Sequence, residues 1–279
     1  MISVIDRTLS VVNVTGEPEA VRAFIAELFA VGVNIVELSE ELYLRLDRKL
    51  PRGKYILRLG RSIDAGRYPE IHRFVASGVA VTNVTTSEDY FVREGDSILE
   101  GMTAPILRPI RLCLKAEPEM TDPQTIFSSL RETFLGHIEF SPRGVTGVAT
   151  MLTAEWILGD GNCAVVTLGG IGGYASLEDV LGFLAAIRRR RSYADKSAFE
   201  RLAAHLSLVV SEELVFDPET LLLGTMSSCH AVKFKLERLG YTISAEKLKA
   251  LTVLVRMESE RLGAPLGDSA LHAICRDNL

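Results

Sequence analysis

The sequence lacks the features that would place it at a membrane or on nucleic acid. None of its apolar runs reaches the roughly 18 uninterrupted residues expected of a membrane-spanning helix. Asp6 stands where a signal peptide would have its basic region and apolar stretch. The 31 Lys and Arg residues are outnumbered by 36 Asp and Glu residues, so the basic face of a nucleic-acid-binding protein is not expected. These absences favour a cytoplasmic protein that contacts neither membranes nor nucleic acids.

Cysteine and histidine are scarce and widely spaced. The four cysteines, Cys113, Cys163, Cys229 and Cys275, form no closely spaced pair, which indicates reduced thiols rather than a disulfide framework. The five histidines include no two at HxH or HxxxH spacing. The short-range ligand pairs that are typical of zinc sites are therefore missing from the sequence.

What the sequence does contain is an alternation of β-branched runs with amphipathic helical stretches. Helices are expected at 15–32 and 68–76, whereas 90–106 shows no clear period. Strands that recur after helices favour right-handed βα units and a parallel sheet. We therefore predict an α/β fold, a TIM-type (β/α) barrel that is either complete or reduced by one βα unit between residues 114 and 137. Seven segments are predicted as strands: 2–5, 33–36, 54–59, 79–84, 110–114, 137–140 and 164–168.

The last third of the chain has a different pattern. From about residue 192 the strand repeat ends and helical periodicity dominates. Gly240 fits the position that follows a helix, and Ser244 fits the cap of the next one. We predict two domains, a barrel over 1–191 and a helical subdomain over 192–279.

In a parallel α/β barrel, reactive groups lie at the carboxyl ends of the strands. Asp6 directly follows the first strand, where it is either a site carboxylate or a residue at the entry of a helix. Glu139 points away from both of its apolar neighbours and is either a ligand for a metal or cationic group, or half of a buried ion pair with an arginine such as Arg58 or Arg143. At or just after the ends of the other predicted strands, the same rule selects Glu37, Arg58, Thr85, Lys115, Glu117, Ser141 and Arg143 as candidate reactive groups.

A glycine cluster follows the last predicted strand. Gly169, Gly170, Gly172 and Gly173 precede a helix that starts near Ser176. Backbone N–H groups at such a place can hold an anion, although a glycine-rich segment after a strand is more often a tight turn. The GxGxxG spacing of dinucleotide-binding proteins is not present.

Four stretches resemble the homocitrate synthase and 2-isopropylmalate synthase branch of the DRE-TIM metallolyases. Residues 4–9, VIDRTL, resemble the opening D-x-T-L-R-D-G, and 32–37, GVNIVE, resemble the second strand with its terminal acid. Residues 141–152, followed by 165–172, resemble the stretch from H-x-H-N into T-V-N-G-I-G-E-R. Residues 224–241, GTMSSCHAVKFKLERLGY, are similar to G-x-H-S-G-x-H-A…L…L-G-Y of the helical subdomain. The four stretches occur in the order of the family and together cover most of the chain.

This resemblance implies a transferase of amino-acid biosynthesis. Such an acyltransferase condenses acetyl-CoA with a 2-oxo acid, which a divalent metal polarises while a base removes a methyl proton. The resemblance also implies a dimer in which the helical subdomain reaches the barrel mouth of the neighbouring subunit. The implied residues are Asp6 and Glu139 for the metal, Glu37 and His230 for catalysis, and Arg58, Thr85, Gly170 and Gly172 for the substrate.

The chain departs from the family at several ligand positions. The two histidines of H-x-H correspond to Glu139 and Ser141, and the arginine of the opening motif corresponds to Ser10. The remaining oxygen ligands suit a hard ion such as Mg²⁺ better than a metal that prefers imidazole. Three functions stay open: a diverged condensing enzyme, a non-catalytic paralogue that pairs with a competent synthase, and a metal-independent lyase or aldolase that uses Lys115 to form a Schiff base. The chain is expected to form a homodimer, or a hetero-oligomer with a synthase subunit.

Overall fold

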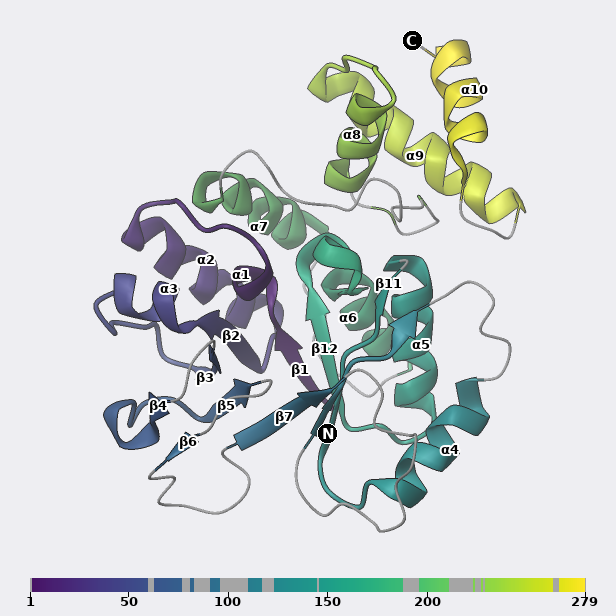
Figure 1. The fold of residues 1–279 in the computed structure, drawn as a ribbon. Coiled ribbons are helices and arrows are strands. Elements are labelled where there is room, and N and C mark those ends of the chain that lie inside the picture. Colours follow the sequence, from purple (N-terminus) through teal and green to yellow (C-terminus); the bar gives the residue numbers. More distant parts are fainter. Residues whose placement is uncertain are drawn as a thin grey trace.

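Eight parallel strands form a closed ring in the computed structural model (Figure 1). Each strand pairs in parallel with the next, and the ring closes where β12 pairs with β1, Ile5 lying opposite Val165. The fold is therefore the predicted TIM-type barrel, and its ring of strands is complete. The strands are β1 (Ser3–Asp6), β2 (Ile35–Ser39), β3 (Lys54–Leu59), β5 (Arg73–Ala76), β7 (Phe91–Gly95), β8 (Ile110–Leu112), β10 (Ile138–Phe140) and β12 (Cys163–Thr167). The structure describes residues 2–59, 63–76, 81–82, 91–95, 110–116, 123–144, 146–187, 196–210, 223, 227, 229–262 and 266–278.

The helices cover the ring unevenly. In the described part of the chain between β3 and β8, the only helical segment is the short 3-10 turn η1 (Ala65–Arg67). The described helices of the first 210 residues are α1 (Thr8–Val11), α2 (Pro18–Val31), α3 (Glu40–Arg45), α4 (Pro123–Thr133), α5 (Thr146–Leu158), α6 (Leu177–Ala186) and α7 (Lys196–Val209). Shorter elements are β4 (Ile63–Asp64) with β6 (Val81–Thr82), β9 (Lys115–Ala116) with β11 (Arg143–Gly144), the 3-10 segment η3 (Leu168–Gly173), and β13 (Ala175–Ser176) beside β12.

Two sequence-based predictions about the ring are corrected. The helix predicted at 68–76 is wrong, because Arg73–Ala76 forms β5. The rings of Tyr68 and Phe74 instead pack together at 6.2 Å from a turn and a strand. The other missed strand is β7, inside the stretch without a clear period. In the strand predicted at 79–84, only β6 is described, and it pairs with β4 outside the ring.

Side chains alternate between the two faces of the barrel wall. Ile5, Ile35, Ile56, Val75, Cys163 and Val165 form a small apolar cluster of their own. Their chain neighbours, such as Val4 and Val36, belong to a much larger cluster that includes the helices. Because successive residues of a strand face opposite ways, the small cluster marks the interior of the barrel. Glu37, Arg58, Arg111 and Glu139 therefore face inward, whereas Asp6, which lies opposite Val36 and Val166, faces the helices.

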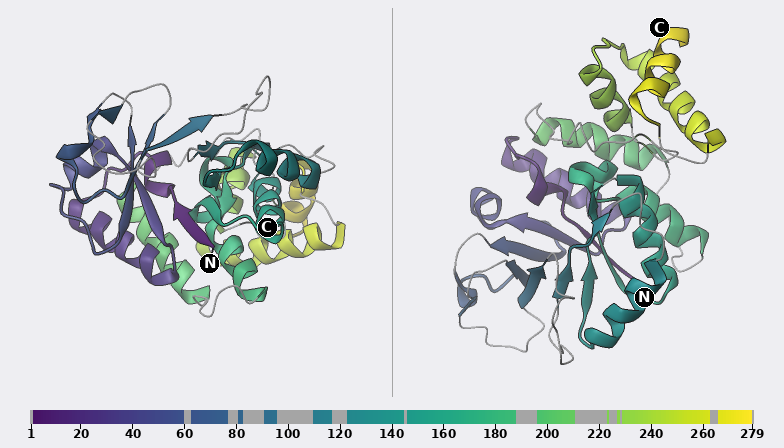
Figure 2. Two further views of the ribbon diagram at one scale, coloured as in Figure 1. Left: turned by 90° about the horizontal axis from the view of Figure 1, so that it is seen from below. Right: turned by 45° about the vertical axis from the view of Figure 1, so that its right-hand side comes forward.

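The C-terminal helices α8 (Cys229–Arg238), α9 (Ala245–Leu262) and α10 (Asp268–Asn278) form a separate group beyond α7 (Figure 2). Gly240 follows α8 with φ +88, as predicted for the residue that ends a helix. The helix α7 packs on α2, and the backbone N–H groups of Thr15 and Gly16 both donate to Val209 O at 3.0 Å. No helix in the described residues has the length and apolar character needed to span a membrane.

Candidate functional site

A network of charged side chains occupies the barrel interior. Arg111 on β8 is fully buried and contacts two buried carboxylates. Its Nε and Nη2 donate to Glu139 Oε2 at 2.9 and 2.7 Å, and its Nη1 forms an ion pair with Glu37 Oε2. The three residues come from β8, β10 and β2, so the guanidinium links strands on different sides of the ring. A planar guanidinium with five N–H donors suits this bridging role.

The second oxygen of Glu37 is also bound. Arg58 Nε and Ser10 Oγ each donate to Glu37 Oε1 at 2.7 Å, and Arg7 Nε lies 3.7 Å from the same oxygen. Burial alone would raise the pKa of Glu37, but the guanidiniums of Arg111, Arg7 and Arg58 hold this pKa well below its ordinary value. Glu37 is therefore ionised at neutral pH and is a weak base. Its geometry makes it a counter-ion that orients arginines.

Glu139 forms the buried ion pair that was one of its two sequence interpretations. Its Oε2 binds Arg111, and its Oε1 accepts from Arg73 Nη1 at 2.7 Å. In the described part of the chain, the partners of Glu139 are thus Arg111 and Arg73 rather than the predicted Arg58 or Arg143. The sequence order does not reveal that β5 and β8 supply the two cations, because β5 had been predicted as part of a helix.

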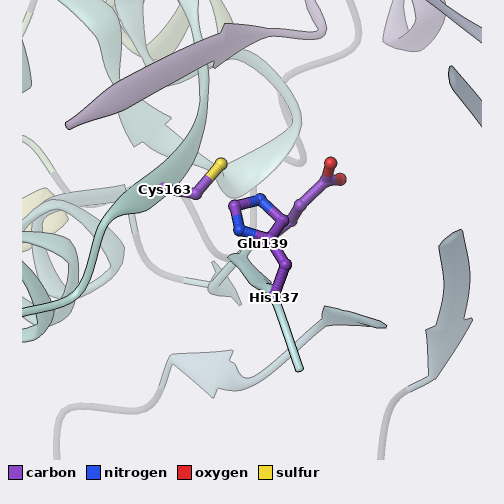
Figure 3. Close-up of side chains that lie close together, drawn as sticks. All are labelled: His137, Glu139 and Cys163. Atoms are coloured by element: carbon purple, nitrogen blue, oxygen red, sulfur yellow. The ribbon is translucent and has the colours of Figure 1, made fainter. Parts of the chain in front are cut away.

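Glu139 also takes part in a group with metal-ligand atoms. His137, Glu139 and Cys163 converge from the starts of β10 and β12 (Figure 3), and each offers one ligand atom within 4.8 Å of the others. Burial, reinforced by the charge of Glu139, raises the pKa of the Cys163 thiol, whereas a metal ligand must be the thiolate. Both oxygens of Glu139 are already bound by guanidiniums. As they stand, these residues do not fit a divalent metal.

Asp6, the other predicted metal ligand, lies on the outer face of the wall. Its carboxylate accepts hydrogen bonds from the backbone N and Oγ1 of Thr8 at 3.0 and 2.9 Å. Leu168 N in turn donates to Thr8 Oγ1 at 2.8 Å. Burial raises the pKa of Asp6 to about 7. The structure thus places Asp6 in a turn that ties β1 to β12, and Glu139 on the opposite face of the wall.

Polar groups gather at the carboxyl ends of the strands. The Arg58 side chain is 23% exposed there, although its Nε is fixed by Glu37. Ser141 is fully buried after β10, and its Oγ has no hydrogen-bond partner in the described part of the chain. Arg7 and Arg143 both lie against the ring of Tyr174, at 4.4 and 5.5 Å from its centroid. This end of the barrel therefore presents guanidiniums and a buried hydroxyl.

The glycine cluster is a turn that only glycine can make readily. Gly169, Gly170, Gly172 and Gly173 all have φ between +62 and +78. Gly169 N donates to both oxygens of Glu178, at 3.1 and 2.9 Å, so this N–H is already used inside the protein. These observations favour the tight-turn interpretation, and the substrate contacts predicted for Gly170 and Gly172 stay predictions.

Some predicted residues fall where the structure gives no description. Thr85 and Glu117 lie outside the described residues, as do the side chains of Lys115 and His230. The residues that the sequence analysis missed are Arg111 and Arg73. Arg111 stands between Ile110 and Leu112 just as Glu139 stands between Ile138 and Phe140, and this shared alternation was the signal available to find it.

The fold is similar to that of several solved enzymes at low sequence identity. The N-terminal domain of a putative aldolase from Bacteroides vulgatus has a TM-score of 0.51 and 10% identity, covering 74% of this chain and 86% of that chain. An HMG-CoA lyase from Brucella melitensis has a TM-score of 0.50 and 9% identity, covering 74% of this chain and 97% of that chain. A variant carboxyl transferase domain of Rhizobium etli pyruvate carboxylase, solved with pyruvate, has a TM-score of 0.52 and 10% identity. The match covers 86% of this chain and 54% of that chain. No protein-family model and no curated protein sequence matches the chain.

Proposed function

We propose that the chain is a diverged DRE-TIM barrel, homocitrate synthase- or 2-isopropylmalate synthase-like, whose mouth binds the carboxylate of a small 2-oxo acid. The observation that carries the proposal is the Arg58 guanidinium, which Glu37 holds at the carboxyl end of β3 while 23% of the side chain stays exposed. Arginine recognises carboxylates through paired N–H donors. Ligands of this fold bind at the same end of the barrel.

Two neighbouring features support this site. The buried Ser141 hydroxyl has a hydrogen bond to give or accept, and a buried polar group without one is costly. Among the described side chains, the guanidiniums of Arg7, Arg58, Arg73 and Arg111 bind the carboxylates of Glu37 and Glu139. Guanidiniums grouped in this way would attract an anionic ligand.

The chemistry of condensation is proposed on the resemblance alone. A divalent metal would supply Lewis-acid polarisation of the oxo group, but the residues present do not fit one, so no step is routed through a metal. Glu37, as a bound and ionised carboxylate, serves to position Arg58 rather than to remove a proton. His230, at the start of α8, remains the proposed acid–base group, with acetyl-CoA as the proposed second substrate.

Binding is tested by titrating the protein with 2-oxoglutarate, 2-oxoisovalerate and pyruvate in a calorimeter, with and without acetyl-CoA. We expect at least one 2-oxo acid to bind and Arg58→Ala to weaken it tenfold or more. Arg22→Ala, which removes an arginine paired with exposed Glu19, is the matched control and leaves binding unchanged. Thiol release from acetyl-CoA separates a catalyst from a protein that only binds. The proposal fails if no 2-oxo acid binds at millimolar concentration, or if both variants respond alike.

A second candidate is a non-catalytic subunit that pairs with a competent synthase. The observation that favours it is an exposed apolar strip on α9, where Val253 and Met257 are one turn apart and 52% and 59% exposed. Co-expression with a homocitrate or isopropylmalate synthase, followed by light scattering, tests this pairing. We expect a hetero-oligomer that Val253→Ser with Met257→Ser dissociates. An unchanged synthase activity and no complex would exclude it.

A further inference from the structure

We propose that Ser141 is the residue that recognises the oxo group of the ligand, its hydroxyl donating a hydrogen bond to the 2-oxo oxygen of an acid whose carboxylate Arg58 binds. The inference rests on the proposed function, because it takes a 2-oxo acid as the ligand. It deepens that function by naming the side chain that distinguishes a 2-oxo acid from the same acid without its oxo group.

The side chain of Ser141 points into the barrel at the carboxyl end of β10. The preceding residue, Phe140, faces the helices, where its ring stacks on Trp156 of α5 at 5.1 Å between centroids. Successive residues of a strand face opposite ways, so Ser141 faces the interior. Its backbone N–H donates to Leu112 O at 2.9 Å and continues the pairing of β10 with β8, which places Ser141 beside Cys113.

The hydroxyl of Ser141 is buried without a partner. The residue is fully buried, and its Oγ makes no hydrogen bond within the described part of the chain. The register places apolar Val165 of β12 beside it, and both oxygens of Glu139, one layer deeper, are already bound by Arg73 and Arg111. A buried hydroxyl in this state is costly and calls for an explanation. A ligand oxygen that accepts its proton supplies one.

Other buried hydroxyls do not share both features of Ser141. Thr167 Oγ1 donates to Ile171 O at 2.8 Å, and Thr153 Oγ1 donates to Ala149 O at 2.9 Å. The hydroxyl of Tyr43 also lacks a partner, but this residue is on α3 and belongs to the cluster between strands and helices. Among the described residues, Ser141 is therefore the one whose unpartnered hydroxyl faces the barrel interior.

An acid held by Arg58 would lie across the barrel from Ser141. In the ring order, β10 lies four strands from β3, so the two strands are on opposite sides. Arg58 is bound to Glu37, Glu37 to Arg111, and Arg111 to Glu139, so a chain of side-chain contacts spans the interior between these strands. The interior of an eight-stranded barrel holds its own side chains or one small ligand. An acid of the size of 2-oxoisovalerate could therefore contact both walls.

This arrangement makes the oxo group a determinant of specificity. A 2-oxo oxygen accepts the hydrogen bond that the protein itself leaves unmade, whereas an acid without this oxygen leaves the hydroxyl unpaired in the complex. Sites that are built to bond a polar group of the ligand reject analogues that lack the group, because a buried polar atom is then left without a partner.

The test measures the affinity of matched pairs of acids by calorimetry: 2-oxoisovalerate with isovalerate, 2-oxoglutarate with glutarate, and pyruvate with propionate. We expect the unsubstituted protein to prefer the 2-oxo acid of at least one pair by about tenfold or more. Ser141→Ala abolishes this preference and leaves the affinity for the acid without the oxo group unchanged. Arg58→Ala weakens both members of the pair. Thr153→Val is the matched control, because it removes a buried hydroxyl that is already bonded inside α5.

A stability measurement separates recognition of the ligand from a structural role. Because the Ser141 hydroxyl is unpartnered, Ser141→Ala is expected to leave the urea midpoint of the ligand-free protein unchanged or to raise it. A lowered midpoint would show that the hydroxyl is bonded within the protein and would overturn the inference. It is also overturned if Ser141→Ala keeps the preference for the 2-oxo acid, or weakens both acids equally.

The outcomes also distinguish this inference from the function on which it rests. If a 2-oxo acid binds, Arg58→Ala weakens it and Ser141→Ala does not, then the recognition of the oxo group by Ser141 is wrong while the proposed function stands. If none of the three 2-oxo acids binds at millimolar concentration, the proposed function fails and the inference about Ser141 fails with it.

Discussion

The Glu37 carboxylate is contacted by four side chains and is the counter-ion of three arginines in the barrel interior. Arg111, Arg58 and Ser10 donate to its two oxygens, and it is fully buried. Replacing one member of a buried ion pair leaves an uncompensated charge, which is far more damaging than losing an exposed pair. Substitution of Glu37 is therefore expected to remove the shared partner of all these donors at once and to destabilise the fold.

We predict that Glu37→Gln lowers the free energy of unfolding by about 3–5 kcal/mol, because buried guanidiniums lose their counter-charge. Urea denaturation measures the change. Glu19→Gln is the matched control, since Glu19 pairs with Arg22 but its side chain is 88% exposed. A control effect close to the experimental error is expected. Equal losses in the two variants would contradict the account of the interior.

The raised pKa of Asp6 makes the stability of the folded protein fall with rising pH, which is the opposite of the effect expected from a carboxylate whose pKa is lowered by folding. Its pKa rises from 3.8 to about 7 on folding because it is buried, so the folded state retains a proton that the unfolded state has released. The stabilisation is complete below pH 4 and is lost as the pH rises through 7, amounting to a few kcal/mol at about 1.4 kcal/mol per pKa unit. Burial raises the pKa of Asp179 as well, to about 8, which adds to the same trend.

We therefore expect the melting temperature to fall between pH 5 and pH 8.5, and Asp6→Asn to make this fall shallower. Differential scanning calorimetry across the pH range is the measurement. Asp277→Asn, at an exposed residue of α10, should leave the slope as it is. A slope that Asp6→Asn does not alter would show that Asp6 is not protonated in the folded protein.

At the scale of elements, the sequence predicts strands where alternation or apolar runs are long. The strand at 54–59 is confirmed residue for residue as β3, and the acid at position 139 faces the interior as its apolar neighbours indicated. The four residues of β5 are too few to show a period of two. Short strands in a ring are fixed by their neighbours more than by their own composition.

The same limit explains why the charged network could not be predicted. Two glutamates at strand ends were recognisable, but their partners come from β5 and β8, 66 and 28 residues away from Glu139. Pairing over such separations depends on the order and stagger of the strands in the ring. The alternatives for Glu139 could be stated from the sequence, and only the register selects among the arginines.

The glycine turn allows a matched test of backbone geometry. Gly173 has φ +78, and a Cβ there would come within 2.3 Å of Gly144 O. Gly240 has φ +88, but nothing lies within 4 Å of a Cβ at that position. We predict that Gly240→Ala costs about 1 kcal/mol from backbone strain alone and that Gly173→Ala costs at least twice as much. Chemical denaturation of both variants measures the difference. Equal costs would mean that β11 moves freely away from the turn.

At the scale of the whole molecule, the packing of the outer wall and the side chains of the interior have to be considered separately. The apolar contacts between strands and helices produce a barrel that is similar to known lyases and transferases at about 10% identity. In the interior, Glu139, one of the two metal ligands implied by the resemblance, is bound by Arg73 and Arg111. Since fold is set by the outer packing and activity by the interior groups, the first does not establish the second.

The extent of the barrel domain is the last prediction. The proposed boundary at residue 191 separates α7 from the barrel, yet Leu202, Leu206 and Val209 are buried and α7 packs on α2. Val14 and Val210 also form an antiparallel bridge. We predict that a fragment of residues 1–210 unfolds cooperatively, whereas 1–191 melts at least several degrees lower or loses its near-ultraviolet dichroism. Exposing three large apolar side chains costs about 1.5–3 kcal/mol each, which is a large part of the stability of a domain.

The control is Leu202→Ser in the 1–210 fragment, which keeps α7 but weakens its packing. We expect its melting temperature to lie between those of the two fragments, because one of the three buried contacts is removed while the backbone bridge to Val14 remains. If 1–191 is as stable as 1–210, then α7 belongs with the helical subdomain and the boundary predicted from the sequence holds. If it is less stable, the barrel extends to Val210, and the end of the strand repeat marks the last strand rather than the last helix that the barrel needs.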